Sequence, residues 1–112
     1  MGLRQVRLAD EVRDILARVF LADKLHDRRL NGVTITHVKL SADLETARVY
    51  FRVYQVEQKE SAQKGLDSCK GFLRSQLAAK LKIRRTPQLF FTYDDSIEKG
   101  SRIEELLRQG KD

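Results

Sequence analysis

The sequence is poor in residues that crosslink a fold or break it. Its 112 residues include one cysteine (Cys69), one proline (Pro87) and no tryptophan. A lone cysteine excludes an internal disulfide and is compatible with a reducing compartment. No apolar stretch approaches the roughly 20 residues that span a bilayer, because Arg18 and Asp23 interrupt the richest one, and no signal peptide opens the chain. We expect a soluble, cytoplasmic protein with no membrane contact.

Residues suited to catalysis or metal binding are also scarce. His26 and His37 lie far apart and have no cysteine or histidine companions at metal-ligand spacing, which argues against a metal site. Cys69 falls on an apolar helix stripe, which favours packing over nucleophilic chemistry. Asp94 and Asp95 adjoin a helix start, where carboxylates cap backbone N–H groups. We therefore predict no enzymatic activity, no metal and no cofactor.

Positive charge is abundant. The chain has 22 Lys and Arg against 16 Asp and Glu, a formal charge of +6 and a pI near 9.7. The segment from Asp67 to Asp94 contains no other acidic residue but six basic ones: Lys70, Arg74, Lys80, Lys82, Arg84 and Arg85. A polyanion is the simplest partner for such a surface. The 41% hydrophobic content is enough for one modest core, so residues 1–112 are expected to form a single domain.

The first half of the chain predicts a helix followed by two strands. Apolar residues recur at helical spacing from about Gln5 to Lys24. Val33 to Leu40 is rich in β-branched residues, and apolar and polar residues alternate from Ala47 to Tyr54, as in a half-buried strand. The intervening Ser41 to Glu45 suits a hairpin connection.

The second half predicts a bent helix, a third strand and a last helix. Helical spacing returns from about Gln58, and Gly71 favours a bend because glycine destabilises a helix interior by about 1 kcal/mol. Pro87 then excludes further helix before a strand over residues 89–93. Asp95 or Ser96 can cap the last helix, which has these apolar residues: Ile97, Ile103, Leu106 and Leu107.

The order αββααβα predicts an α+β fold with a three-stranded mixed sheet and its helices packed on one face. The side chains on the polar face of the second strand could be solvent exposed or part of a binding site, and the first reading is favoured: Arg48, Tyr50, Arg52 and Tyr54. Phe90 and Phe91 point to opposite faces, so at least one should be in the core. Neither is expected to stack on bases.

The chain resembles the ribosome-binding factor A family along nearly its full length. The resemblance depends on the order and spacing of short pieces: Asp27, Arg29, Leu30, Val38, Leu40, Ser41, Asp43, Leu44, Ala47, Val49, Tyr50, Gly71, Phe72, Leu73, Arg74, Ser75, Leu77, Arg84, Pro87, Leu89, Phe91, Tyr93, Asp94, Ser96, Gly100, Arg102, Ile103 and Leu107. Any single piece is weak evidence, but together they are specific.

The resemblance implies a type II KH-like domain in which a helix-kink-helix replaces the GxxG loop, with Cys69, Lys70 and Gly71 at the kink. It also implies an assembly factor, not an enzyme, that binds the immature small ribosomal subunit and its ribosomal RNA. Such a factor assists late maturation and RNA processing, especially in the cold. We expect it to be monomeric when free.

The residues expected to bind RNA are Lys70, Gly71, Arg74, Lys80, Lys82, Arg84 and Arg85. Lysine and arginine neutralise phosphates and release counterions. A helix start after the kink adds partial positive charge, and Gly71 has no side chain to hold a phosphate away. The alternative hypothesis is a protein-interaction module whose basic face binds an acidic protein.

Overall fold

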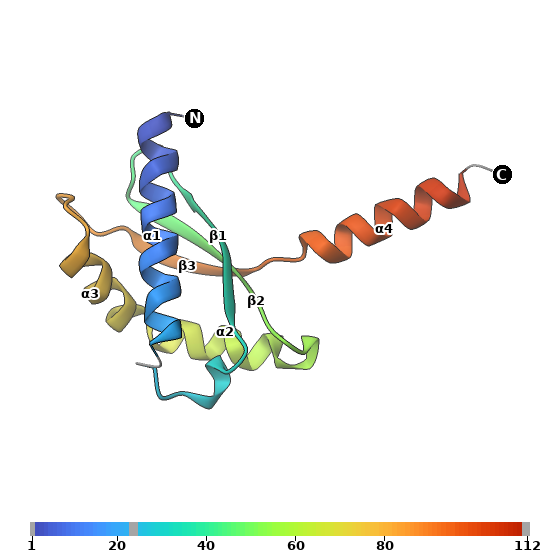
Figure 1. Cartoon of the computed structure of the whole chain (residues 1–112), viewed down its shortest axis with the longest axis horizontal. Coiled ribbons are helices and arrows are strands. Elements are labelled where there is room, and N and C mark those ends of the chain that lie inside the picture. Colours follow the sequence, from blue (N-terminus) through green and yellow to red (C-terminus); the bar gives the residue numbers. More distant parts are fainter. Residues whose placement is uncertain (1, 23–24, 111–112) are drawn as a thin grey trace.

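The computed structural model describes residues 2–22 and 25–110 and has the predicted element order (Figure 1). Its main elements are α1 (Leu3–Leu21), β1 (Thr34–Leu40), β2 (Thr46–Arg52), α2 (Lys59–Ser68), α3 (Lys70–Lys80), β3 (Gln88–Tyr93) and α4 (Ser96–Gln109). Two short 3-10 helices, η1 (Arg28–Leu30) and η2 (Val56–Gln58), precede β1 and α2. Lys24, the expected end of the first helix, lies outside the described residues.

The three strands form one mixed sheet in the order β1-β2-β3. β1 and β2 are antiparallel, and β2 and β3 are parallel. A parallel pair needs a crossover connection, which α2 and α3 supply. The α+β architecture is therefore confirmed, and it is that expected of a KH-like domain.

One face of the sheet carries the core. Ala47, Val49 and Phe51 alternate along β2 and are fully buried, and α1 crosses this face in Figure 1. From α1, α2 and α3, residues such as Leu16 and Leu73 complete the core, and both are fully buried. None of the described helices covers the opposite face of the sheet, so its side chains are partly or fully exposed.

The hairpin between β1 and β2 is held by the side chains predicted for it. The Ser41 hydroxyl donates to Asp43 Oδ1 at 2.6 Å, and Asp43 Oδ1 also accepts from the Glu45 backbone N–H at 3.0 Å. The Ser41 hydroxyl bond is the main cause of the lowered pKa of Asp43. Leu44 occupies the left-handed region at φ 62°, which the sequence does not indicate.

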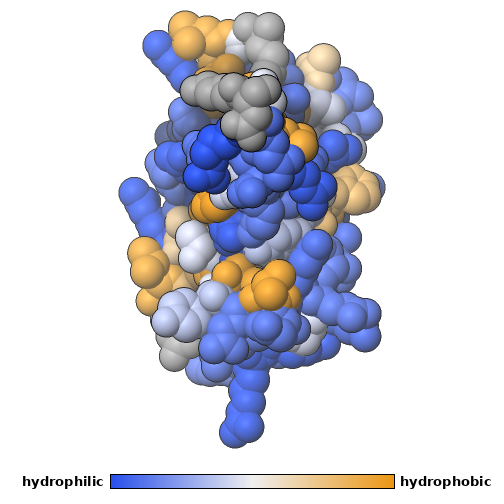
Figure 2. Space-filling model, turned by 90° about the vertical axis from the view of Figure 1, so that its right-hand side faces the viewer, coloured by the Kyte–Doolittle hydropathy of each residue, from blue (hydrophilic) through white to orange (hydrophobic). Residues whose placement is uncertain are grey.

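The last helix, α4, differs from the expectation that the helices pack on one face. It projects from the sheet (Figure 1), and none of its residues is buried. Its apolar side chains are 57% to 64% exposed: Ile97, Ile103, Leu106 and Leu107. Figure 2 looks from the side on which α4 projects and shows hydrophobic patches among hydrophilic side chains. No helix in the described part of the chain is long and apolar enough to cross a membrane.

The start of α4 is tied to the sheet by Asp94. Its carboxylate accepts from Thr36 Oγ1 at 2.6 Å and from the Ser96 backbone N–H at 3.0 Å. These bonds, that of Thr36 first, lower its pKa to about 2. Asp95 is the N-cap residue, as predicted, but its side chain makes no capping hydrogen bond, and the Asp94 carboxylate binds the first backbone N–H of the helix instead. The structural role expected of Asp94 is confirmed.

Candidate nucleic-acid interface

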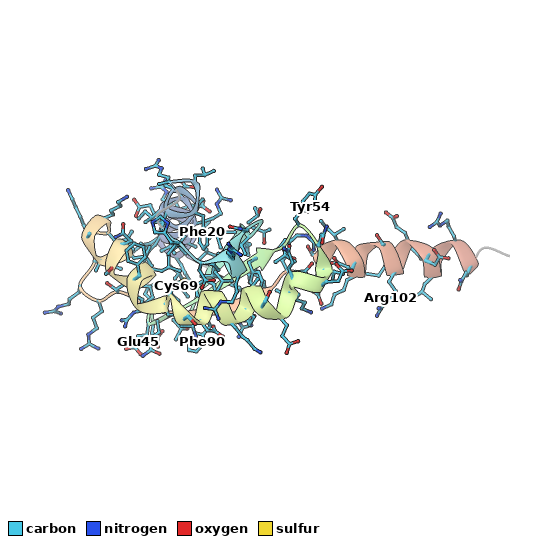
Figure 3. The ribbon with its side chains drawn as sticks, turned by 90° about the horizontal axis from the view of Figure 1, so that it is seen from below. Phe20, Glu45, Tyr54, Cys69, Phe90 and Arg102 are labelled. Carbon is cyan, nitrogen blue, oxygen red and sulfur yellow. The ribbon has the colours of Figure 1, made fainter. Side chains whose placement is uncertain are left out.

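The kink between α2 and α3 lies at the expected place. Cys69 separates the two helices, with φ −101° and ψ 11°, and Lys70 begins α3. Gly71 follows in the first turn, and a Cβ added to it would meet no heavy atom within 4 Å. The backbone at Gly71 is therefore open to a close approach. Figure 3 shows Cys69 at this junction.

The glycines of the two helices have different surroundings. Gly65 is buried in α2, and a Cβ on it would lie 3.0 Å from both Arg29 Cβ and Leu30 Cδ2. It is therefore needed for the close packing of α2 against η1, and it does not interrupt the helix. Gly71 has no such packing requirement, which leaves it free for a local role at the kink.

Cys69 has the packing role that was predicted for it. It is half-buried, and its Sγ lies 3.4 Å from the Leu66 carbonyl oxygen, to which the thiol donates. Burial is the main cause that raises the pKa of this thiol, to about 11. A thiol with such a pKa is protonated at neutral pH and is a poor nucleophile.

Lys70 lies between an acidic and an aromatic neighbour. Its Nζ is 3.4 Å from Asp67 Oδ1 and 5.4 Å from the centroid of the Phe90 ring. The ion pair is exposed, so it competes only weakly with a bound phosphate. Lys70 thereby connects the kink to the edge strand β3.

Arg74 has a role in the fold. Its Nε donates to the Pro87 carbonyl oxygen at 3.2 Å, and one terminal nitrogen donates to the Thr86 carbonyl oxygen at 3.0 Å. These bonds hold the basic loop, defined here as residues 81–87, against α3. The sequence gives no sign of this role, because the two partners are backbone atoms more than ten residues away.

The other predicted cations lie at the far end of α3. Lys80 ends the helix, and Lys82, Arg84 and Arg85 are exposed on the basic loop. Among the ion pairs of the described residues, only that of Arg85 involves these four, with Glu45 at 4.0 Å. A contact at that distance between exposed side chains leaves Arg85 largely available.

Two arginines of α1 join the basic loop, and the sequence analysis missed them. Arg4, Arg7 and Lys82 line one hollow of about 450 Å³. Arg4 and Lys82 also line a second hollow of about 280 Å³, with Arg84 and Arg85. We call Arg4, Arg7, Lys82, Arg84 and Arg85 the basic cluster. Helical spacing places Arg4 and Arg7 on one face of α1, but only the tertiary fold brings that face to residues 82–85.

Carboxylates border the basic cluster without covering it. Glu11 lines the first hollow, and Asp43 and Glu45 line the second. The kink and the basic cluster lie at opposite ends of α3, whose 11 residues span about 15 Å. The predicted site residues therefore form two separate groups, which cannot hold the same phosphate.

Residues 4–107 match the family model described as ribosome-binding factor A. The crystal structure of ribosome-binding factor A from Thermus thermophilus is similar, with 30% identity over 83% of this chain and 97% of that one and a TM-score of 0.71. A Thermotoga maritima protein solved by NMR has 25% identity over 82% and 88% of the two chains and the same TM-score.

A third similar structure comes from a ribosomal complex. It is a homology model of the Thermus thermophilus factor, fitted into the cryo-EM map of a 30S complex with that factor. It has 30% identity over 81% of this chain and 96% of that one, with a TM-score of 0.67.

Proposed function

The chain belongs to the ribosome-binding factor A family, and we propose that it binds the immature small ribosomal subunit through its ribosomal RNA. The observation that carries the proposal is the similarity over most of both chains to the Thermus thermophilus factor, which was fitted into a 30S complex. The protein acts by binding, as a single-domain monomer and not as an enzyme. It assists late maturation and RNA processing, especially in the cold.

The basic cluster is proposed as the main phosphate contact. Arg4 and Arg7 of α1 and three residues of the basic loop offer several cations over one surface. Each neutralised phosphate releases counterions, so the affinity falls with salt concentration. Four to six such contacts would give a log–log slope of roughly −3 to −5.

The kink is proposed as a second phosphate contact. Gly71 leaves the backbone accessible, and Lys70 adds a flexible positive charge beside it. The start of α3 contributes partial positive charge from its backbone N–H groups. Because α3 separates the kink from the basic cluster, the two groups contact different stretches of RNA.

Sedimentation of cell extract tests the proposal most simply. The protein should be enriched with free small subunits over complete ribosomes, and the enrichment should fall when the salt concentration is raised. Recovery only in the unbound fraction at low salt would contradict the proposal. Competition separates the alternative, because a structured RNA should displace the protein from subunits and polyglutamate at equal charge concentration should not.

A further inference from the structure

The face of the sheet that none of the described helices covers presents a row of three side chains across all three strands. Lys39 of β1 pairs with Arg48 of β2, and Arg48 pairs with Phe90 of β3. All three side chains are exposed, and Phe90 is 47% exposed. In Figure 3, Phe90 lies on the side of the molecule away from Phe20 and α1.

The pairing of Lys39 with Arg48 is unfavourable in the free protein. Like charges directly opposite each other in an antiparallel pair destabilise a sheet. Neither side chain makes an ion pair with any described residue. An anion bound between them would remove this repulsion.

The same row lines a hollow next to the aromatic ring. It has a volume of about 390 Å³, within the range of small-ligand sites. Lys39, Arg48 and Phe90 line it, together with the hydroxyl-bearing Ser41 and Thr46. The site therefore combines positive charge, hydroxyl groups and one exposed ring.

A second row continues the surface. His37 and Tyr50 are paired between β1 and β2, with ring centroids 5.8 Å apart, and Thr92 follows on β3. Neither row contains a carboxylate. Acidic side chains border this surface: Asp67 pairs with Lys70 beside Phe90, Asp10 lines a hollow with His37 and Lys39, Glu45 lies by Arg85, and Asp94 is held by Thr36 and Ser96.

We propose that this face binds a short single-stranded segment of RNA. One base stacks on Phe90, and the adjoining phosphates contact Lys39 and Arg48. Aromatic rings and cations together are what single-stranded nucleic acid requires, because every base has a face for stacking. Lys70, over the Phe90 ring, makes this surface continuous with the kink. The inference rests on the proposed RNA-binding function and revises the expectation that Phe90 does not stack.

The test uses the whole 112-residue chain and a fluorescent, unstructured RNA of about ten nucleotides, the scale of a single-strand site. Fluorescence anisotropy gives the dissociation constants. Phe90→Ala should weaken binding by about five- to a hundred-fold through lost stacking, and Phe90→Tyr should retain most of the affinity. Tyr54→Ala is the matched control, because Tyr54 is 86% exposed and outside both rows.

Replacement of Arg48 gives a second test, which distinguishes RNA binding by this side chain from a purely structural role. Arg48→Gln should lower the affinity while the thermal midpoint stays equal or rises, because the variant loses a repulsion with Lys39. A lowered midpoint with unchanged affinity would overturn the proposed role of Arg48.

The outcomes separate this inference from the proposed function. If Phe90→Ala and Arg48→Gln bind the RNA as the parent does, while reversal of Lys82, Arg84 and Arg85 weakens subunit binding, only the inference fails. The same holds if Tyr54→Ala loses as much affinity as Phe90→Ala. If the parent protein binds neither the RNA nor small subunits, the proposed function fails as well.

Photo-cross-linking of the parent protein avoids any dependence on how the variants fold. A 4-thiouridine in the RNA should cross-link to peptides from β2 and β3 that contain Arg48 and Phe90. Cross-links confined to the basic loop or α1 would overturn the inference.

Discussion

Arg52 of β2 holds Glu98 of α4 with two hydrogen bonds, at 3.0 and 2.7 Å between their side-chain nitrogen and oxygen atoms. Arg52 also donates to the Asp94 carbonyl oxygen at 2.6 Å. One guanidinium therefore connects the central strand to both the start and the first turn of α4. Since α4 buries no residue, we infer that this connection sets the direction in which the helix projects.

The direction of α4 should become variable in acid. The hydrogen bonds from Arg52 lower the pKa of Glu98 from 4.5 to about 2. Because the pKa of Glu98 is lower in the folded state than in the unfolded state, the ion pair between Arg52 and Glu98 stabilises the fold fully above about pH 4.5. This stabilisation is lost as the pH falls toward 2. Spin labels at S61C and S101C, in a Cys69→Ala background, should give a narrow distance distribution at pH 7 that broadens in acid.

Two variants control this measurement. Arg52→Gln should give a broad distribution already at pH 7, because the tie is absent at every pH. Arg102→Gln changes a charge of α4 that makes no ion pair among the described residues, and it should match the parent. A distribution that stays narrow in Arg52→Gln would show that Arg52 does not orient α4.

Two glycines of neighbouring helices should respond oppositely to alanine. Gly65→Ala should destabilise by about 1–2 kcal/mol, because the new methyl group meets Arg29 and Leu30 at 3.0 Å, and overpacking exceeds the gain in helix propensity. Gly71→Ala should be neutral or stabilise by up to about 1 kcal/mol, because no atom lies within 4 Å. Urea denaturation measures both.

The Gly71 variant also tests the proposed kink contact. Its added methyl group should weaken subunit binding although the fold is as stable as before. If Gly71→Ala binds subunits normally, the backbone at the kink does not approach a phosphate closely.

Leu73→Ala should lower the free energy of unfolding by about 2–5 kcal/mol, since Leu73 is fully buried in α3. Phe72→Ala removes a larger side chain from the neighbouring position. Because Phe72 is 39% exposed, this variant should lose less free energy of unfolding than Leu73→Ala. Calorimetric melting compares the two. Equal losses in the two variants would contradict the packing described for α3.

Cys69 should react slowly with iodoacetamide at pH 8. Burial raises the pKa of its thiol to about 11, so little thiolate is present, and the half-buried position of the side chain limits access. Unfolding in urea should restore the rate expected of a free cysteine. A native rate equal to the unfolded rate would show that the thiol is not protected.

Much of the fold follows from local patterns in the sequence. The alternation along β2 assigns Ala47, Val49 and Phe51 to the core, and the opposite directions of Phe90 and Phe91 are confirmed, with Phe91 in the core. The kink was predicted from Gly71 and the family resemblance, and the boundary between the two helices falls slightly before that glycine, at Cys69. These features depend on neighbours in the chain.

Features that depend on distant contacts were missed. An apolar stripe looks the same whether a helix packs or projects, so the exposure of Ile103 and Leu107 could not be predicted. Arg4 joins Lys82 only because α1 lies beside the basic loop. The repulsive pair of Lys39 and Arg48 depends on the strand register, which the sequence alone leaves undetermined.

RNA binding by the basic cluster is tested most directly by the salt dependence with which a variant of the cluster binds purified small subunits. K82E/R84E/R85E should bind much more weakly than the parent, with a log–log salt slope reduced by about 2–3, and should keep its thermal midpoint. K99E/R102E/R108E on α4 is the matched control, with the same change of formal net charge, and should largely retain the parent's slope. Equal losses in both variants, or an unchanged slope in the first, would contradict the claim that the basic cluster binds ribosomal RNA phosphates.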